Sequence, residues 1–173
     1  GMFAFALWDT RERCLYLARD RFGIKPLYYV DSSSTLLFAS ESKSFRAHPD
    51  FTGRVCVPAL IEYLTFQNFF TGKTLLDGVQ LLPPGTFMSI RENTDDIEIT
   101  QYWDFAFADK NSGASEAELM EELDRLFTQA VNRQLISDVS VGAYLSGGID
   151  SGSITAVAAR KVPSMSTFTI GFD

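Results

Sequence analysis

The chain has 173 residues, of which 22 are acidic and 15 are basic, so its formal net charge is −7. Apolar residues make up 46% and aromatic residues 13% of the chain, a composition that supports a packed core and excludes an intrinsically disordered protein. The acidic balance argues against a protein that binds nucleic acid through its phosphates, and no apolar run approaches the ~20 residues needed to span a membrane.

Four short strands are predicted near the start of the chain, over residues 3–8, 14–18, 27–30 and 36–39. Each is an apolar or alternating run bounded by polar, glycine or proline residues. Their short connections favour an antiparallel meander. Because the chain begins directly on a strand with a core pattern, we expect that a preceding part of this domain is missing.

The middle of the chain is predicted to hold one helix and one hairpin. Helical spacing of apolar residues indicates a helix over 58–66, which begins with a proline. Strands at 86–90 and 97–102 flank a polar turn at 91–96 and form the hairpin. A polar segment that contains a glycine, at 106–114, is the best candidate for a linker between domains.

The clearest predicted helix covers residues 115–136. Ser115 and Glu118 form the Ser-x-x-Glu pattern of a capping box at its start. An apolar stripe along one face predicts a buried side, made by Leu119, Leu123, Leu126, Phe127, Ala130 and Val131.

A strand, a helix and a second strand follow in that order. Apolar runs predict buried strands at 139–145 and 166–172, and a helix with small side chains at 154–160 lies between them. This order is typical of a βαβ unit, whose two strands are parallel. Two parallel strands cannot bury both of their faces, so we expect that this domain continues beyond the chain.

The turn between the first of these strands and the helix, residues 146–151, carries the most informative chemistry. Gly147 and Gly148 allow a tight turn that gathers several backbone N–H groups, and the start of a helix adds positive potential at the same place. Ser146 and Ser151 add hydroxyl groups, so the turn predicts an anion-binding loop sized for phosphate. It is neither a Walker A loop nor the GxGxxG loop of dinucleotide-binding proteins.

Asp150 in this turn requires its own explanation, because a carboxylate repels phosphate unless a cation lies between them. It therefore suggests a Mg²⁺ ion that bridges to a pyrophosphate. The alternative is that Ser146 and Asp150 only cap a helix and that the glycines only form a turn.

Residues 146–151, Ser-Gly-Gly-Ile-Asp-Ser, resemble the SGGxDS PP-loop of the ATP pyrophosphatases. These enzymes split ATP between its α and β phosphates and adenylate a substrate. The motif alone does not choose among asparagine, GMP, argininosuccinate and NAD synthetases or tRNA-thiolating enzymes.

Further segments select among these families. The chain resembles the class II (Ntn) glutaminase domain of glutamine-dependent asparagine synthetases in GMFAFALWD at 1–9, RDRFGIKPLYY at 19–29, ASESK at 39–43, LPPG at 82–85 and the pair Tyr102-Trp103. This resemblance implies an α+β part followed by an α/β part. The first, over 1–105, is the C-terminal part of the glutaminase domain, a partial Ntn αββα antiparallel sandwich. A linker over 106–114 leads to the second, over 115–173, the first βαβ of a Rossmann-like PP-loop domain.

The resemblance also implies an activity and a set of small-molecule partners. Glutamine is hydrolysed to ammonia, ATP activates the aspartate side chain as β-aspartyl-AMP, and ammonia converts this intermediate to asparagine. Asp150 is expected to bind Mg²⁺, and neither nucleic acid nor a membrane is an expected partner, whereas a homodimer is left open. The residues implied to bind ATP are Tyr144, Leu145, Ser146, Gly147, Gly148, Ile149, Asp150, Ser151, Ile170 and Gly171.

The glutaminase chemistry requires a nucleophile that this chain does not offer. Such enzymes use an N-terminal cysteine whose free α-amino group is the base, and Gly1 stands at the first position. Cys14 and Cys56 have no free α-amino group and are interpreted as small core residues. We therefore expect no catalytic residue, and a fragment that hydrolyses no glutamine and makes no asparagine.

Three alternatives stay open. β-Lactam synthetases and peptide amidotransferases or cyclases share both halves of the resemblance. A truncated, non-catalytic module that binds ATP weakly or pairs with a partner chain is the second alternative. An incomplete gene model is the third.

Other prominent residues are assigned structural roles. Arg19 and Asp20 could face a glutamine pocket or an interdomain surface, but an ion pair that fixes the loop is favoured. Phe66, Phe69 and Phe70 could line a domain interface, but ordinary core packing is favoured. The two cysteines are too few for a disulfide framework and, with one histidine, for a structural zinc site, which indicates a reducing, cytoplasmic setting.

Overall fold

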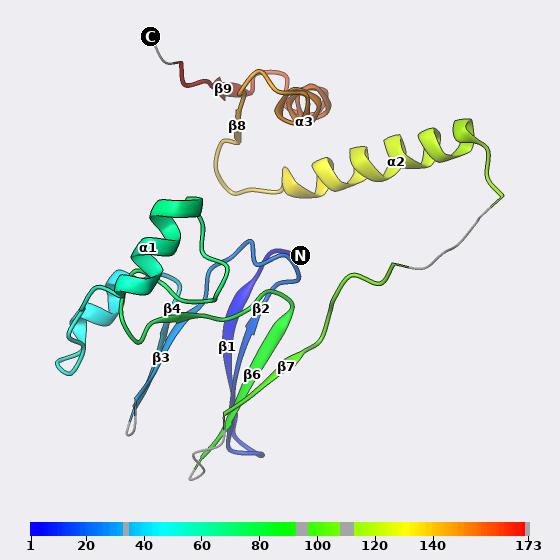
Figure 1. Cartoon of the computed structure of the whole chain (residues 1–173). Coiled ribbons are helices and arrows are strands. Elements are labelled where there is room, and N and C mark those ends of the chain that lie inside the picture. Colours follow the sequence, from blue (N-terminus) through cyan, green and yellow to red (C-terminus); the bar gives the residue numbers. More distant parts are fainter. Residues whose placement is uncertain (33–34, 93–96, 108–112, 172–173) are drawn as a thin grey trace. The chain divides into compact units, whose positions relative to one another are not determined.

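The computed structural model describes residues 1–32, 35–92, 97–107 and 113–171. The chain divides into two compact units, Gly1–Phe107 and Ala108–Asp173 (Figure 1). Most of the predicted linker at 106–114 and of the predicted turn at 91–96 lies outside the described residues.

The first unit is built on two antiparallel sheets. One sheet has the strand order β1-β2-β6-β7, and the other has the order β4-β3-β5. The strands are β1 (Ala4–Asp9), β2 (Cys14–Arg19), β3 (Tyr28–Ser32), β4 (Thr35–Ala39), β5 (Gln80–Leu81), β6 (Thr86–Arg91) and β7 (Ile97–Gln101). The predicted four-stranded meander is therefore wrong, because β2 pairs with the distant β6 while β3 and β4 belong to the other sheet. The two predicted hairpins within it and the later β6–β7 hairpin are confirmed.

The core of this unit lies between the two sheets. Leu17 of β2 and Met88 of β6 are register partners, and both are fully buried. They pack with Leu27, Tyr29 and Leu82, which come from the second sheet and its flanking loops. Replacing Leu17 or Met88 with alanine should therefore lower the free energy of unfolding by roughly 2–5 kcal/mol.

The opposite face of the four-stranded sheet is also apolar but is not covered. Phe5 and Leu7 are 47% and 52% exposed, and they lie with Tyr16, Ala18 and Phe87 along one shallow apolar groove. Both faces of this sheet therefore carry apolar side chains, and only one of them is buried within the described residues.

Asp20, which directly follows β2, is a buried carboxylate that organises the adjacent loop. It is 1% exposed, and its two oxygens accept hydrogen bonds from four backbone N–H groups. Burial opposes its ionisation, but these four donors hold its pKa below the usual range. The donors are Lys25 at 2.9 Å, Ile24 at 3.0 Å, Phe22 at 3.1 Å and Phe3 at 3.3 Å.

Arg19 is also buried, and its guanidinium satisfies three backbone carbonyl groups. It donates to the carbonyl oxygens of Leu82 at 2.6 Å, Gly23 at 2.7 Å and Lys25 at 2.9 Å. Gly23 has a φ of +63°, and a Cβ there would lie 2.8 Å from the Arg19 guanidinium, so glycine is required for two reasons. Arg19 and Asp20 do fix the loop, as expected, but each does so through hydrogen bonds to backbone groups. The expected ion pair between them is absent from the described salt bridges.

Helix α1 (Val57–Phe66) follows a 3₁₀ segment (Ser42–Ala47) and closely matches the predicted helix. Pro58 stands in its first turn, and the chain leaves the helix through Gln67 in a left-handed conformation. Phe66 and Phe70 are 61% and 70% exposed and contact each other edge to face. Ordinary core packing for these two phenylalanines was therefore the wrong expectation.

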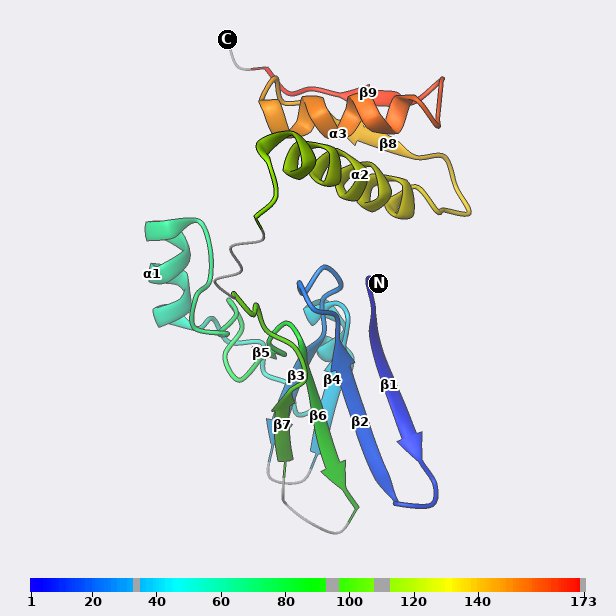
Figure 2. The ribbon, with the colours of Figure 1, turned by 90° about the vertical axis from the view of Figure 1, so that its right-hand side faces the viewer.

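The second unit contains α2 (Glu116–Gln134), β8 (Gly142–Tyr144), α3 (Ile149–Ala159) and β9 (Ser166–Phe168). The predicted capping box of α2 is present, with Ser115 as the N-cap and Glu118 as its partner. Strands β8 and β9 pair in parallel, as predicted, and α2 packs on α3 (Figure 2). The helix pair buries Val131, Val157 and Ala158.

The predicted boundaries in this unit require three corrections. Helix α3 begins at Ile149 rather than at 154, because Gly148 serves as its N-cap. The strands are shorter than predicted and β9 is exposed, since each has only one neighbouring strand within the described residues. Of the predicted buried stripe along α2, only Phe127 and Val131 pack against α3, and Leu119, Leu123 and Leu126 are 55%, 67% and 46% exposed.

Candidate functional site

The glycine-rich turn connects the carboxyl end of β8 to the start of α3. Gly147 has a φ of +83°, a conformation that L side chains rarely adopt. A Cβ at this position would meet no heavy atom within 4 Å, so glycine is required by the backbone conformation and not by lack of space. The turn thus leaves open space beside its backbone where a ligand can approach.

Two serine hydroxyls brace the turn from both ends. The Ser146 and Ser151 hydroxyl oxygens lie 2.9 Å apart, and the Ser151 hydroxyl also accepts from the Ser146 N–H at 3.2 Å. The Ser151 hydroxyl reaches the carbonyl oxygen of Gly148 at 3.2 Å as well. The predicted hydroxyl groups therefore shape the loop, and Ser146 remains exposed at its mouth.

No side chain caps the start of α3. Gly148 is the N-cap and forms no side-chain cap hydrogen bond, while its carbonyl accepts the first helical bond from Gly152 at 3.0 Å. The alternative that Ser146 and Asp150 only cap a helix is therefore not supported. Uncapped N–H groups in a first helical turn point away from the helix body and favour an anion.

Asp150 lies in the first turn of α3 and is exposed. Within the described residues, no cluster of three or more His, Cys, Asp or Glu side chains could hold a metal ion by itself. A single carboxylate fits Mg²⁺ when phosphate oxygens and water supply the other ligands, which is the usual arrangement at phosphate sites. Asp150 could therefore supply one ligand to a Mg²⁺ ion, and the described residues contain no complete set of ligands.

The ends of the two parallel strands lie beside the turn. Leu145 donates its N–H to the carbonyl oxygen of Phe168 at 2.9 Å, which extends the β8–β9 pairing to the first residue before the turn. Tyr144 and Ile170 are 81% and 78% exposed, and Ile170 and Gly171 lie just beyond β9. The predicted ATP-binding residues are thus gathered at one edge of the unit.

Thr169 is a residue that the sequence analysis missed. Its hydroxyl donates to the carbonyl oxygen of Leu145 at 2.6 Å and so ties the end of β9 to the strand that enters the turn. In the sequence, only its position directly before the predicted residues Ile170 and Gly171 points to Thr169. It fixes the turn relative to β9.

The two cysteines occupy structural positions. Cys14 is 2% exposed in β2, as expected for a core residue, and Cys56 is a half-buried residue that precedes α1 as its N-cap. Both are free thiols. The titratable group beside the Cys14 thiol is the Tyr16 phenol, whose pKa is raised by a side-chain hydrogen bond with Cys14, so this phenol stays protonated at neutral pH and is not a general base.

Two family models match the chain. The model for a glutamine amidotransferase domain matches residues 1–103, and the model for asparagine synthase matches residues 122–173. The first match covers most of the first unit, and the second includes α3 and the glycine-rich turn. The antiparallel sheets of the first unit are consistent with a glutaminase domain.

Curated relatives match the whole chain. Glutamine-hydrolyzing asparagine synthetase 1 of Bacillus subtilis is 40% identical over 174 residues, which cover 100% of this chain and 27% of the relative. Asparagine synthetase 3 of the same organism is 38% identical over 92% of the chain and 25% of the relative, and amidase chyE of Penicillium rubens is 37% identical over 100% and 27%. The chain thus spans about a quarter of the length of these relatives. On the match over residues 1–103, the chain belongs to the glutamine amidotransferase domain family, and it continues into a segment that matches asparagine synthase.

Proposed function

We propose that the chain is part of a glutamine-hydrolysing asparagine synthetase and that its second unit binds the phosphates of ATP. The observation that carries this proposal is the uncapped start of α3 behind the Gly147–Gly148 turn, in a chain where the two family matches follow in this order. The domain limits we propose are 1–105 and 115–173, with a linker at 106–114. A Rossmann-like fold is proposed for the second domain, of which β8, α3 and β9 form the first βαβ unit.

In the proposed reaction, the amide of glutamine is hydrolysed to ammonia and glutamate. A side-chain oxygen of aspartate attacks the α-phosphorus of ATP, which forms β-aspartyl-AMP and releases pyrophosphate. Ammonia then attacks the activated carbonyl, so that a C–N bond forms, AMP leaves and asparagine results. Within this scheme, the loop N–H groups and the hydroxyls of Ser146 and Ser151 bind the phosphates that leave as pyrophosphate.

Asp150 is the proposed Mg²⁺ ligand of this site. Mg²⁺ neutralises the phosphate charge when it is bound. Tyr144 and Leu145 before the turn, and Ile170 and Gly171 after β9, are proposed to lie along the nucleoside. Their position at the ends of β8 and β9 supports this assignment, since ligands of open parallel sheets bind at the carboxyl ends of strands.

The similarity to amidase chyE supports a second candidate, a related ATP-dependent enzyme that forms an amide on another acceptor. A β-lactam synthetase would be one example of this second candidate. The acceptor distinguishes these candidates: release of pyrophosphate from ATP by the whole enzyme in response to aspartate supports the synthetase. Release only with another carboxylic acid supports the second candidate. The cytoplasmic location and the homodimer stay predictions.

The binding of Mg-ATP to the chain tests the phosphate site. We expect Asp150→Ala to weaken binding by roughly tenfold when Mg²⁺ is present, because one carboxylate ligand is lost, and to have little effect when Mg²⁺ is chelated. Asp138→Ala removes an exposed carboxylate from the same unit and serves as the matched control. Equal Mg-ATP affinity of Asp150→Ala and the parent chain would show that the metal role is wrong.

A further inference from the structure

The second unit contains a polar groove between α2 and the carboxyl end of α3. Its volume is about 700 Å³, a size that suits a small-molecule ligand. Residues 113–171 contain four basic and seven acidic side chains. All four of the basic ones line this groove, and they are Arg125, Arg133, Arg160 and Lys161.

These cations differ in how far they are neutralised. Arg125 forms two hydrogen bonds with Glu122, both at 2.6 Å. Among the salt bridges of the described residues, none engages Arg133, Arg160 or Lys161. An acidic unit that carries two cations without a described salt bridge, Arg160 and Lys161, at the same end of α3 creates a local positive potential there, against its own net charge.

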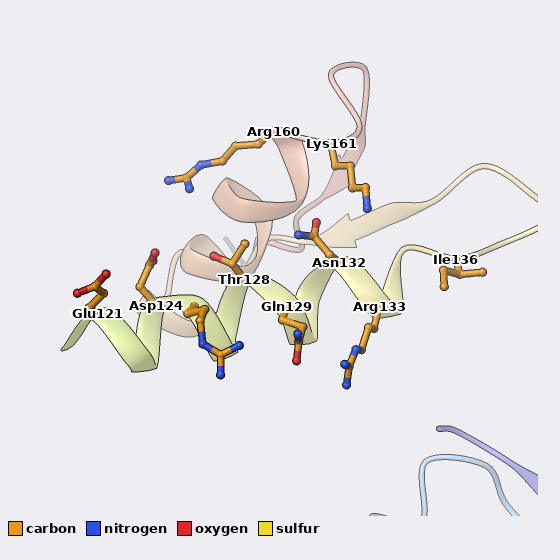
Figure 3. Close-up of a pocket in the computed structure, with 10 residues that line it drawn as sticks. Glu121, Asp124, Thr128, Gln129, Asn132, Arg133, Ile136, Arg160 and Lys161 are labelled. Carbon is orange, nitrogen blue, oxygen red and sulfur yellow. The ribbon is translucent and has the colours of Figure 1, made fainter. Parts of the chain in front are cut away.

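Uncharged polar groups of α2 face the same cations. Thr128 and Asn132 project from α2 toward the end of α3 that carries Arg160 and Lys161, whereas Arg133 points to the other side of α2 (Figure 3). Thr128 and Asn132 are one helical turn apart and half-buried. The Thr128 hydroxyl is buried and has no hydrogen-bond partner within the described residues. A buried hydroxyl without a partner costs about 1–3 kcal/mol. A rotation of the Thr128 side chain that aims the hydroxyl into the groove would let a bound acceptor recover this cost.

The acidic residues of the groove limit the ligand to a compact one. Glu121 and Asp124 lie on the N-terminal side of Thr128, and Asp124 also projects toward α3 (Figure 3). Asp124 and Asn132 are eight residues apart in one helix, which separates their Cα atoms by roughly 12 Å. A long polyanion such as nucleic acid would meet the two carboxylates, whereas a single oxyanion at the Asn132 end would not.

The groove is separate from the glycine-rich turn. Asp150 stands in the first turn of α3 and Arg160 is its C-cap, so the helix length of roughly 16 Å lies between the two places. The backbone at the carboxyl end of a helix carries partial negative charge, so an anion here depends on side chains alone.

We infer that this groove binds a compact oxyanion, a phosphate or carboxylate group of a small molecule, through Arg160, Lys161, Asn132 and the Thr128 hydroxyl. The inference does not require the turn at Gly147 to bind ATP. Lys161 points toward Asn132, whereas the Arg160 guanidinium extends toward the Asp124 end of α2 (Figure 3), so Arg160 must change its rotamer to share the anion with Lys161. Charge-assisted hydrogen bonds from the two cations then hold the anion, and the amide and hydroxyl of α2 orient it.

Amide NMR shifts of the full chain, titrated with inorganic phosphate and separately with succinate, test the inference. Sodium chloride at matched ionic strength is the reference for screening. We expect shifts at Thr128, Asn132, Arg160 and Lys161 that saturate with one or both probes. Saturable shifts with phosphate alone indicate that the natural ligand carries a phosphate group, and saturable shifts with succinate alone indicate that it carries a carboxylate group. Absence of saturable shifts with both probes overturns the inference.

Four variants sharpen the test. The double variant Arg160→Ala/Lys161→Ala should weaken probe binding on the order of tenfold, whereas Arg11→Ala, which removes a cation from the first unit, should leave it unchanged. Asp124→Asn should strengthen binding by about twofold, because a like charge is removed. Thr128→Val keeps the side-chain shape and removes the hydroxyl, so it should weaken binding about threefold without loss of stability.

Three of these variants also have an outcome that refutes the inference. Equal losses in Arg11→Ala and the double variant would mean non-specific screening, and weaker binding in Asp124→Asn would contradict the charge argument. The variant Gly147→Ala separates this site from the proposed function. It should impair Mg-ATP binding and leave the phosphate or succinate shifts in the groove intact.

Discussion

The buried carboxylate of Asp20 allows a quantitative test of the first unit. Asp20→Asn keeps the size of the side chain but replaces one oxygen with an NH₂ group. Oδ2 accepts from Phe3 at 3.3 Å and from Lys25 at 2.9 Å, and the new NH₂ group cannot accept from either donor. Hydrogen bonds to a charged group contribute about 1.5–3 kcal/mol each, so the loss of two should lower the free energy of unfolding by about 3–6 kcal/mol.

Urea unfolding followed by tryptophan fluorescence measures this change in the right unit. Both tryptophans, Trp8 and Trp103, lie in Gly1–Phe107, so the signal reports the first unit alone. Asp31→Asn makes the same chemical change at an exposed position of β3 and should alter the free energy of unfolding by less than ~0.5 kcal/mol. A loss below ~1 kcal/mol in Asp20→Asn would refute the role given to its backbone donors.

The dependence on pH provides a second check of the same reasoning. The pKa of Asp20 is lowered in the folded state, so the unfolded chain binds the proton more readily. The stabilisation is therefore complete above the unfolded pKa of about 3.9 and is lost as the pH falls through the folded pKa. The difference in unfolding free energy between the parent chain and Asp20→Asn should shrink over that range. A difference that does not change with pH would contradict an ionised Asp20.

Two further substitutions probe the second unit. Gly147→Ala places a Cβ at a φ of +83°, so the turn should be strained by about 1–2 kcal/mol and Mg-ATP binding should weaken, while the tryptophan-detected unfolding of the first unit stays the same. Unchanged Mg-ATP affinity would count against the turn as the phosphate site. Ser115→Ala removes the capping box of α2 and should reduce the stability of its helix by about 1 kcal/mol, measured by thermal unfolding in far-UV circular dichroism. Ser164→Ala, at an exposed position outside the helices, is its control and should unfold like the parent chain.

Local patterns in the sequence were sufficient to place most elements of the first unit. Alternation and turn residues located the strands, and the spacing around Pro58 located α1. The pairing of β2 with β6 was missed because alternation tells which residues share a face and does not tell which strand lies alongside. The burial of Asp20 was missed for the same reason, since its donors become neighbours only after the loop has closed.

In the second unit, too, the sequence predicts local features but not those that depend on distant residues. The glycine-rich turn was predictable because its residues are contiguous, whereas the start of α3 was missed because glycine and serine at its N-terminus hide the helical periodicity. The groove beside Thr128 had no local signal. Its cations form two groups that are distant in the chain, Arg125 and Arg133 on α2 and the adjacent Arg160 and Lys161 at the end of α3, and only the packing of α2 on α3 brings the two groups to one groove.

The apolar character of both faces of the four-stranded sheet has a consequence for strand alignment. In most sheets a slip by one residue is prevented because it would bury polar side chains, but a slip of β1 or β2 here would mainly exchange one set of apolar side chains for another. The backbone of Asp20 fixes the alignment in another way. Its N–H donates to the carbonyl oxygen of Phe3, and its carbonyl oxygen accepts from the N–H of Gly85, each at 2.9 Å. The ends of β1, β2 and β6 are therefore pinned at a common point, and polar contacts at one residue set the alignment of the whole sheet.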